Sequence, residues 1–364
     1  MSDMHVLRLD EQLANLDWPE PKTIDVPSIV PGSVLVMCAG FEDRALAVLT
    51  RALNGGEKGF RLFCVDYLPA VIANRRAEVE ELCRRHDIVL ERVAYDRENP
   101  AGGGEQILRA VAAASRLYID VSGMSRLLIV QLLAETVRSG LLRKTEILYA
   151  EAAEYPPSRH TVETELPNSA DPVGLTMFLS AGVFGLTVVP ELSSVEMQGQ
   201  PIRVVAFPSW NPSQIAALCS EMQTSSFTII NGIPRDESDY WKLDAMRRLN
   251  RIDSLSPREE FEVSTREYRD VLRLLLRIYR EHAQREKIVV SPTGSKMQSV
   301  AIGLVCGWLR DIQIAYPTPK EFSPPDRYTR GVGCVYSLSL ESCSAVEVEG
   351  FSEPDAAEEM GDAL

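Results

Sequence analysis

The sequence predicts an α/β fold made of two tandem Rossmann-like lobes, related by internal duplication and paired about a pseudo-two-fold axis, with mainly parallel sheets. Short apolar runs alternate with helical stretches of about ten or more residues, which is typical of βαβ units. Two of these runs, within 117–126 and 287–296, end in small-residue turns that open apolar helices. The elements around both turns follow in the same order, and a repeated order predicts duplication.

In the first half, each short apolar run predicts a strand. Strands that helices cover on both faces are apolar throughout and lack the apolar–polar alternation of half-exposed strands. We expect strands at 33–38, 61–65, 117–121 and 145–150, with one more between the second and third of these. Helices are expected up to residue 53, at about 69–85, before residue 117, and at about 127–139. The sequence Tyr155-Pro156-Pro157 then interrupts the pattern.

The second half repeats this arrangement. Its expected strands are 203–207, 227–231, 287–291 and 311–316, and its expected helices are about 212–222, 236–250 and 298–309. Pro317 is expected to end the last of these strands. Residues 182–189 also resemble residues 331–338, which adds one more element to the repeat.

The two halves meet near residues 193–200, a polar stretch. The predicted organisation is therefore an N-terminal extension (1–32), a first lobe (33–192), a second lobe (200–340) and an acidic tail (341–364). An uncharged run at 173–189 contains three glycines and precedes Pro190, so we interpret it as buried loop and strand instead of a membrane span.

Charge and composition narrow the classes of function. The chain has 364 residues, of which 45% are hydrophobic and 25% charged, the balance of a globular protein. Its net charge is -14, and the tail alone carries eight acidic residues and no basic one. Non-specific binding to nucleic acid or to an anionic membrane requires a basic surface, so we expect neither as a partner.

The cysteines and histidines predict a cytoplasmic protein without a metal site. The seven cysteines form no CxxC pair, which predicts reduced, mostly buried thiols. The four histidines form no HxxxH or HExxH motif, so no metal site is expected. The N-terminus lacks the basic segment and apolar core of a secretory signal. GxGxxG and Walker A motifs are also missing, and no cofactor is expected.

Ligands of open parallel sheets bind beyond the carboxyl ends of the strands, so the strand-to-helix loops are the candidate sites. The loop at 291–296 has the clearest chemistry. Gly294 would allow a close backbone approach and a positive φ, while Thr293 and Ser295 supply hydroxyl groups. Lys296 adds a cation at a helix start, where the dipole favours an anion. This pattern predicts a phosphate site, and an ordinary helix cap is the alternative.

The loop at 120–126 repeats that chemistry. Aligned on the glycine, the matched pairs are Ser122 with Thr293, Gly123 with Gly294, and Ser125 with Lys296. This alignment places Arg126 one position beyond the equivalent of Lys296. Asp120 is unexpected beside a phosphate, and it either binds a ribose hydroxyl or caps the helix.

Two more loops follow the first strand of each half. One holds Gly40, Phe41, Glu42, Asp43 and Arg44, and the other holds Ser209, Trp210 and Asn211. Adjacent carboxylates suggest Glu42 or Asp43 as a general base, but acidic residues in a first helical turn are also favoured by the helix dipole. The Trp210 indole either stacks on a base or anchors the core.

The strand, the turn from Thr293 to Lys296 and the apolar helix that follows together resemble the ligand loop of CRISPR-associated Rossmann-fold (CARF and SAVED-like) sensor domains of prokaryotic antiphage defence. The resemblance covers the architecture of about residues 33–340. It implies a cyclic oligonucleotide bound between two lobes, with phosphate and ribose held by residues 293–296 and by Ser122, Gly123 and Ser125. The chain has no recognisable effector module, so the effector would be a separate protein.

Three functions remain open. The leading hypothesis is a cytoplasmic sensor that binds a nucleotide-type ligand, such as a cyclic oligonucleotide, and signals to a partner effector. The second is an enzyme that hydrolyses a phosphodiester or glycosidic bond, with Glu42 or Asp43 as base and Lys296 stabilising the developing charge. The third is a structural subunit of a defence complex. The sensor requires that all four loops line one cleft.

Overall fold

The computed structural model describes residues 8–70, 74–165, 180–194, 197–251, 258–322 and 328–345. Its first sheet contains β1 (Lys22–Ile24), β2 (Val34–Cys38), β3 (Arg61–Leu68), β4 (Val89–Asp96), β5 (Leu117–Asp120), β6 (Thr145–Ala150) and β13 (Val335–Ser339). Its second sheet contains β7 (Ser180–Val188), β8 (Ile202–Ala206), β9 (Thr224–Ile233), β10 (Arg258–Ser264), β11 (Lys287–Ser291) and β12 (Gln313–Phe322).

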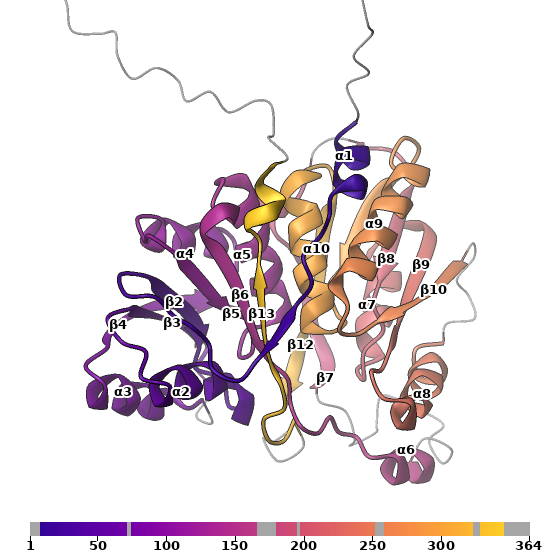
Figure 1. Cartoon of the computed structure of the whole chain (residues 1–364). Helices are drawn as coiled ribbons and strands as arrows, with labels where there is room; N and C mark the ends of the chain where they lie inside the picture. The colour runs from indigo at the N-terminus through magenta and orange to yellow at the C-terminus, as the bar shows by residue number, and fades with distance from the viewer. Residues whose placement is uncertain are drawn as a thin grey trace, which may run out of the picture.

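Both sheets have the same topology (Figure 1). Five neighbouring strands are parallel in the order β4-β3-β2-β5-β6 in one sheet and β10-β9-β8-β11-β12 in the other. The predicted fold class, two Rossmann-like α/β lobes with mainly parallel sheets, is confirmed. β2 corresponds to β8 and β5 to β11, so the four candidate loops leave equivalent strands.

The outermost strands are exchanged between the lobes. β13 follows β12 along the chain but pairs antiparallel with β6 of the first sheet. β7 follows β6 but pairs antiparallel with β12 of the second sheet. The two predicted segments, 33–192 and 200–340, are therefore interlocked, because each contributes a strand to the sheet of the other. The predicted N-terminal extension also joins the fold, since β1 pairs with β13.

Helices cover both faces of each sheet. They are α1 (Leu9–Asn15), α2 (Ala47–Asn54), α3 (Arg76–Arg85), α4 (Gly103–Val111), α5 (Arg126–Arg138), α6 (Arg159–Glu165), α7 (Ser213–Glu221), α8 (Trp241–Leu249), α9 (Tyr268–His282) and α10 (Lys296–Trp308). Alternate residues of β2 face opposite sides, so Val36 enters a central core with α5 and α10 while Met37 packs under α2 and α3. On the far side of the second sheet, α7 covers β8 and β9.

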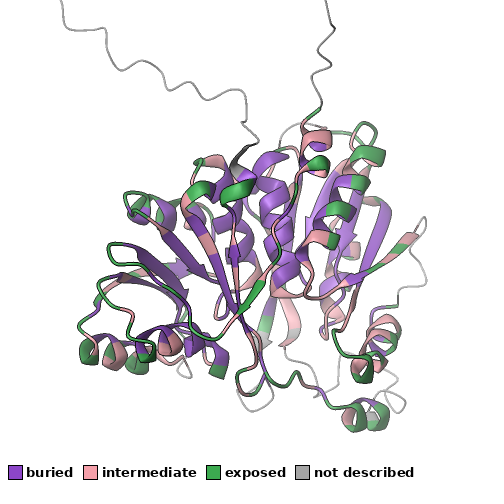
Figure 2. Cartoon of the chain, in the orientation of Figure 1, coloured by how far each residue is buried: buried purple, intermediate pink, exposed green. Residues whose placement is uncertain are grey.

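The two lobes are joined through α5 and α10, which are equally long at 13 residues. Both helices are buried along almost their whole length (Figure 2). Close approach depends on Gly303 and Gly307 of α10. A Cβ atom at Gly303 would lie 2.9 Å from Leu133 Cβ, and one at Gly307 would lie 2.5 Å from Val137 Cβ. The missing side chains let the helices pack tightly, which fixes one lobe against the other.

Several predicted boundaries need correction. The helix expected at 69–85 begins at Arg76, because β3 continues to Leu68. β12 continues past Pro317, since beyond Ile314 its hydrogen-bonded partner is β7 and not β11. β7 is a half-exposed edge strand and not a buried one, with Phe184 66% exposed. The part of the 173–189 run before residue 180 lies outside the described residues, as does the predicted tail beyond residue 345.

The prediction of unpaired, mostly buried cysteines is confirmed. All seven cysteines are unpaired thiols, and five of them are buried. Within the described part of the chain, none of the helices has the length and apolar character needed to cross a membrane.

Candidate functional site

A cavity of about 1470 Å³ lies between the lobes, at the carboxyl ends of the parallel strands. The four candidate loops line it together, as the sensor hypothesis required. The predicted residues on its wall are Gly40, Phe41, Glu42, Arg44, Gly123, Ser125, Arg126, Ser209, Trp210, Asn211, Thr293, Gly294, Ser295 and Lys296. Asp43, Asp120 and Ser122 are not among the lining residues.

Two serines position the cations at the bottom of the cavity. Ser125 Oγ caps α5 by accepting from the Leu128 amide at 3.3 Å, and Ser295 Oγ caps α10 by accepting from the Gln298 amide at 3.1 Å. The residues after the caps, Arg126 and Lys296, are therefore equivalent. The predicted alignment of Ser125 with Lys296 is wrong by one residue, because it was anchored on the glycines instead of the caps.

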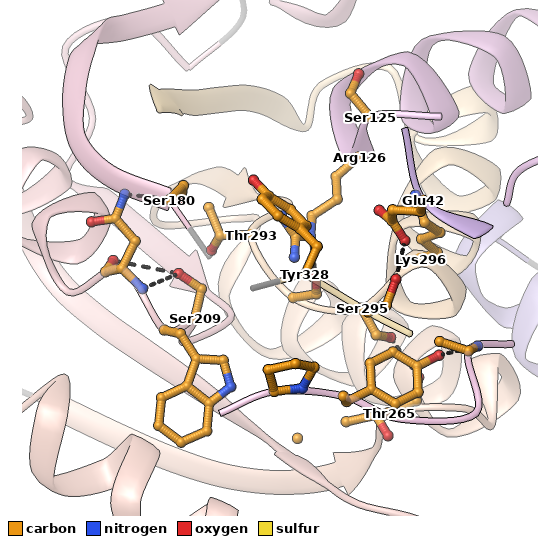
Figure 3. A pocket seen from close by; sticks show the side chains of 18 of the residues that line it. Glu42, Ser125, Arg126, Ser180, Ser209, Thr265, Thr293, Ser295, Lys296 and Tyr328 are labelled. Atoms are coloured by element: carbon orange, nitrogen blue, oxygen red, sulfur yellow. Dashed lines mark hydrogen bonds between the residues drawn. The ribbon is translucent and has the colours of Figure 1, made fainter. Parts of the chain in front are cut away.

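Arg126 and Lys296 reach across the interface between the lobes. Arg126 Nε donates to the carbonyl oxygen of Gly294, in the turn before α10. Lys296 Nζ donates to the carbonyl oxygen of Met124, in the turn before α5. Both side chains are half-buried and also line the cavity. Lys296 lies beside Glu42, and the Arg126 side chain extends towards Tyr328 (Figure 3).

Arg44 is the third cation of this cluster. It belongs to the 3-10 turn η1 (Asp43–Leu46) and is only 5% exposed. Its guanidinium donates to Glu42, and to the hydroxyl groups of Tyr149 at 3.1 Å and Tyr155 at 3.2 Å. We call Arg44, Arg126 and Lys296 the cation cluster.

The cation cluster has more basic side chains than neighbouring carboxylates. Although burial favours a neutral Glu42 carboxyl, Arg44 and Lys296 hold the pKa of Glu42 at about 2. Burial and the neighbouring Arg44 lower the pKa of Lys296 to about 7, despite the opposing effect of Glu42. One ionised carboxylate thus faces three basic side chains, so a bound anion would restore the protonated form of Lys296.

Asp120 and Ser122 are structural. Both are fully buried below the cavity. Asp120 Oδ1 accepts from the Ser122 amide at 2.9 Å and from its hydroxyl, and Ser122 Oγ accepts from the Ala150 amide at 2.7 Å. Burial raises the pKa of Asp120 to about 7. The two residues shape the turn before α5, and neither is placed to touch a ligand in the cavity.

The hydroxyl groups of the turn at 293–296 form hydrogen bonds within the protein. Thr293 Oγ1 donates to the carbonyl oxygen of Phe207, and Ser295 Oγ donates to that of Thr265. Gly294 does not have the predicted positive φ. A Cβ atom there would lie 2.1 Å from Gln298 Oε1, so a larger residue would displace the Gln298 side chain that bonds the Ser295 amide. Of the four predicted residues, Lys296 is the one that brings charge to the cavity.

The loops after β2 and β8 differ in chemistry. Phe41 packs edge-on against Tyr328 with ring centroids 4.6 Å apart. Asp43 points away from the cavity: its side chain is 61% exposed, and its carboxylate accepts from the Gly331 amide at 2.9 Å. In the other loop, half-buried Trp210 lies 6.4 Å from Trp241, and Asn211 Nδ2 donates to the Gly182 carbonyl oxygen at 2.9 Å.

Tyrosines form a large part of the wall, and no motif in the sequence marked them as site residues. Tyr67 accepts a hydrogen bond from the Ser125 amide, which ties β3 to the start of α5. Other aromatic residues on the wall are Tyr95, Tyr149, Tyr155, Phe184, Trp241, Tyr316 and Tyr328. Among the described residues, ten lysines and arginines line the cavity against six aspartates and glutamates. The cavity is therefore basic in a chain of net charge -14.

The described residues contain no cluster of three or more histidine, cysteine or acidic side chains suited to a metal ion. No family model matches the chain, and no curated protein does. Eighteen chains of known structure match it. They include a protein of unknown function from Pseudomonas aeruginosa PAO1, with 9% identity over 93% of this chain and 100% of that one and a TM-score of 0.23. A candidate universal stress protein from Pseudomonas aeruginosa UCBPP-PA14 shares 10% identity over 82% of this chain and 95% of that one, also with a TM-score of 0.23.

Proposed function

We propose that this protein binds a nucleotide-type ligand in the cavity between its lobes and passes that event to a partner effector in the cytoplasm. The observation that carries the proposal is the cation cluster, which both lobes build at the bottom of a large cavity. An anion bound there touches both lobes at once, so its binding can change how they pack. The role in antiphage defence comes from the sequence resemblance alone.

The charge distribution supports an anionic ligand. The rest of the molecule repels anions, since the chain carries -14 in total. Three basic side chains and one carboxylate meet at the cavity bottom, where partial burial weakens screening by solvent. Such a local basic site in an acidic protein favours small anions over long nucleic acids.

The aromatic wall and the volume support a base as part of the ligand. Aromatic side chains stack on nucleobases, which have a π-face whatever their sequence. The cavity of about 1470 Å³ exceeds the usual range of about 300–1000 Å³ for small-ligand pockets. A dinucleotide or a larger oligonucleotide fits this space better than a simple phosphate does.

Glu42 and Asp43, the candidate bases of the hydrolase hypothesis, are poorly suited to that role. Glu42 is held ionised by Arg44 and also accepts a hydrogen bond from Thr329 Oγ1 at 2.6 Å, which makes it a weak proton acceptor. Asp43 lies outside the cavity. A scaffold role stays as the alternative if the cavity binds nothing.

A thermal-shift screen tests the proposal. The purified chain is heated with cyclic and linear oligonucleotides, mononucleotides and NAD, alongside Lys296→Met and Lys58→Ala. A ligand at 100 times its Kd should add about 2.7 kcal/mol of stability. We expect a shift for wild type and for Lys58→Ala, whose lysine is exposed and not part of the cavity wall. Lys296→Met should lose it. If no compound shifts any of the three proteins, the scaffold role replaces the sensor.

A further inference from the structure

The two ends of the cavity carry different chemistry although the lobes are duplicated. The loops after β2 and β8 leave equivalent strands, so Glu42 corresponds to Trp210 and Arg44 to Pro212. Glu42 and Arg44 are charged and lie beside Lys296. Their counterparts, Trp210 and Pro212, carry no charge. One loop therefore presents an ion pair to the cavity, and its counterpart presents an indole.

The polar side chains of the loop after β8 are already hydrogen-bonded within the protein. Ser209 Oγ donates to Gln214 Oε1 at 2.6 Å and accepts from the Asn211 amide at 3.1 Å. The Asn211 amide side chain is bound to β7. The cations that line the cavity near this loop are Lys242, Arg159 and Lys320. Lys242 forms an ion pair with Asp239 at 2.9 Å and lies 5.5 Å from the Trp241 ring, and Arg159 pairs with Glu163 at 2.7 Å. The half-buried Trp210 indole is the aromatic group that this loop contributes to the cavity wall.

The two chemistries lie apart in space. Lys296 and Glu42 lie on one side of the cavity, the Arg126 side chain extends to Tyr328 in the middle, and Ser209, next to Trp210 in the chain, lies on the opposite side (Figure 3). Tyr328 and Thr293 lie between them. A ligand that complements both ends brings negative charge to the cation cluster and a planar group to Trp210.

We propose that the cavity binds its ligand in a single orientation, with phosphate at the cation cluster and a nucleobase against Trp210. The inference rests on the proposed function and narrows it. The preferred ligand has its phosphates together at one end, as in a linear nucleotide or dinucleotide with a terminal phosphate. A two-fold symmetric ring would place equivalent phosphates at two ends, and one of those ends has no counterpart of Arg44.

Two probes that differ by one nucleoside separate the two ends. Inorganic tripolyphosphate and adenosine 5′-triphosphate are titrated by calorimetry into wild type, Lys296→Met, Trp210→Ala and Trp210→Phe. For wild type we expect ATP to bind at least about tenfold more tightly than tripolyphosphate, because the base stacks on the indole. Lys296→Met should weaken both probes by about tenfold or more.

The Trp210 variants decide the inference. Trp210→Ala should bring ATP to the affinity of tripolyphosphate and leave tripolyphosphate unchanged, and Trp210→Phe should keep most of the advantage of ATP. Equal affinity of wild type for both probes, or equal weakening of both by Trp210→Ala, overturns the single orientation and leaves the anion site intact. If wild type binds neither probe, the single orientation is also overturned. The proposed function then fails only if the whole oligonucleotide screen is negative as well.

Discussion

Arg126 and Lys296 are the first residues of two equivalent helices, and each donates a hydrogen bond to the turn that precedes the other helix. The exchange places two cations from different lobes at one point. Neither lobe could form this site alone, because each supplies one side chain and one carbonyl oxygen. A ligand that attracts both cations acts on both contacts between the turns.

Lys296 should make stability rise with pH in the alkaline range. Its pKa is about 7 in the folded chain and 10.5 in the unfolded one, so between these values the unfolded state binds more protons. The free energy of unfolding of wild type, minus that of Lys296→Met, should be flat below pH 7. It should then rise by at most about 1.4 kcal/mol per pH unit up to about pH 10. Urea titrations at pH 6, 7, 8 and 9 measure it, and a flat difference would exclude the lowered pKa.

Asp120 should act in the opposite direction and over a lower pH range. Its pKa is about 7 when folded and 3.8 when unfolded, so the folded state holds the extra proton between these values. The stability of wild type relative to Asp120→Asn should therefore decrease from about pH 4 to pH 7 and level off above it. Urea titrations at pH 4.5, 6 and 8 measure the trend. A difference that increases over this range would contradict the raised pKa.

Gly307→Ala should destabilise the contact between the lobes. The new Cβ atom would lie 2.5 Å from Val137 Cβ, and such overpacking costs about 1–3 kcal/mol. Chemical denaturation gives the loss, and the double variant Gly307→Ala, Val137→Ala should recover part of it. Gly185→Ala is the control, because a Cβ atom there has no neighbour within 4 Å. Equal stabilities for the two glycine variants would show that α5 and α10 can separate at little cost.

Cutting the chain between the halves should not separate the lobes. A protease site inserted at Gly199, in an exposed turn, allows cleavage of the folded protein. Because β7 and β13 are each paired in the sheet of the other half, the two fragments should elute together in size-exclusion chromatography and part only in denaturant. Two separate folded fragments under native conditions would contradict the strand exchange.

The order of strands and helices was predictable because its signals are local. Apolar runs mark buried strands, and small-residue turns mark helix starts, wherever they occur in the chain. The strand exchange was not predictable. Residues 182–189 and 331–338 resemble one another, so either could pair with either sheet. Which sheet accepts which strand depends on the path of the chain through space.

That the four loops meet was predictable, since parallel strands bring their following loops to one edge. The alignment of the two turns was off by one because their glycines are not equivalent. The capping pattern of Ser295 with Gln298 would have set the correct position. Tyr149 and Tyr155 carried no signal, because a tyrosine in a strand or beside prolines is ordinary and only tertiary packing brings both to Arg44.

The exchange of β7 and β13 is what the fusion of two identical one-lobe chains would produce. Two identical one-lobe chains that traded their last strands would form a symmetric homodimer with the same pairings. Joining such chains end to end gives the present order of elements and breaks no strand pair. Once fused, the copies could diverge, and one loop could acquire Glu42 and Arg44 while its twin acquired Trp210. A homodimer could never hold charge at one end of its cavity alone, because every substitution would be inherited by both.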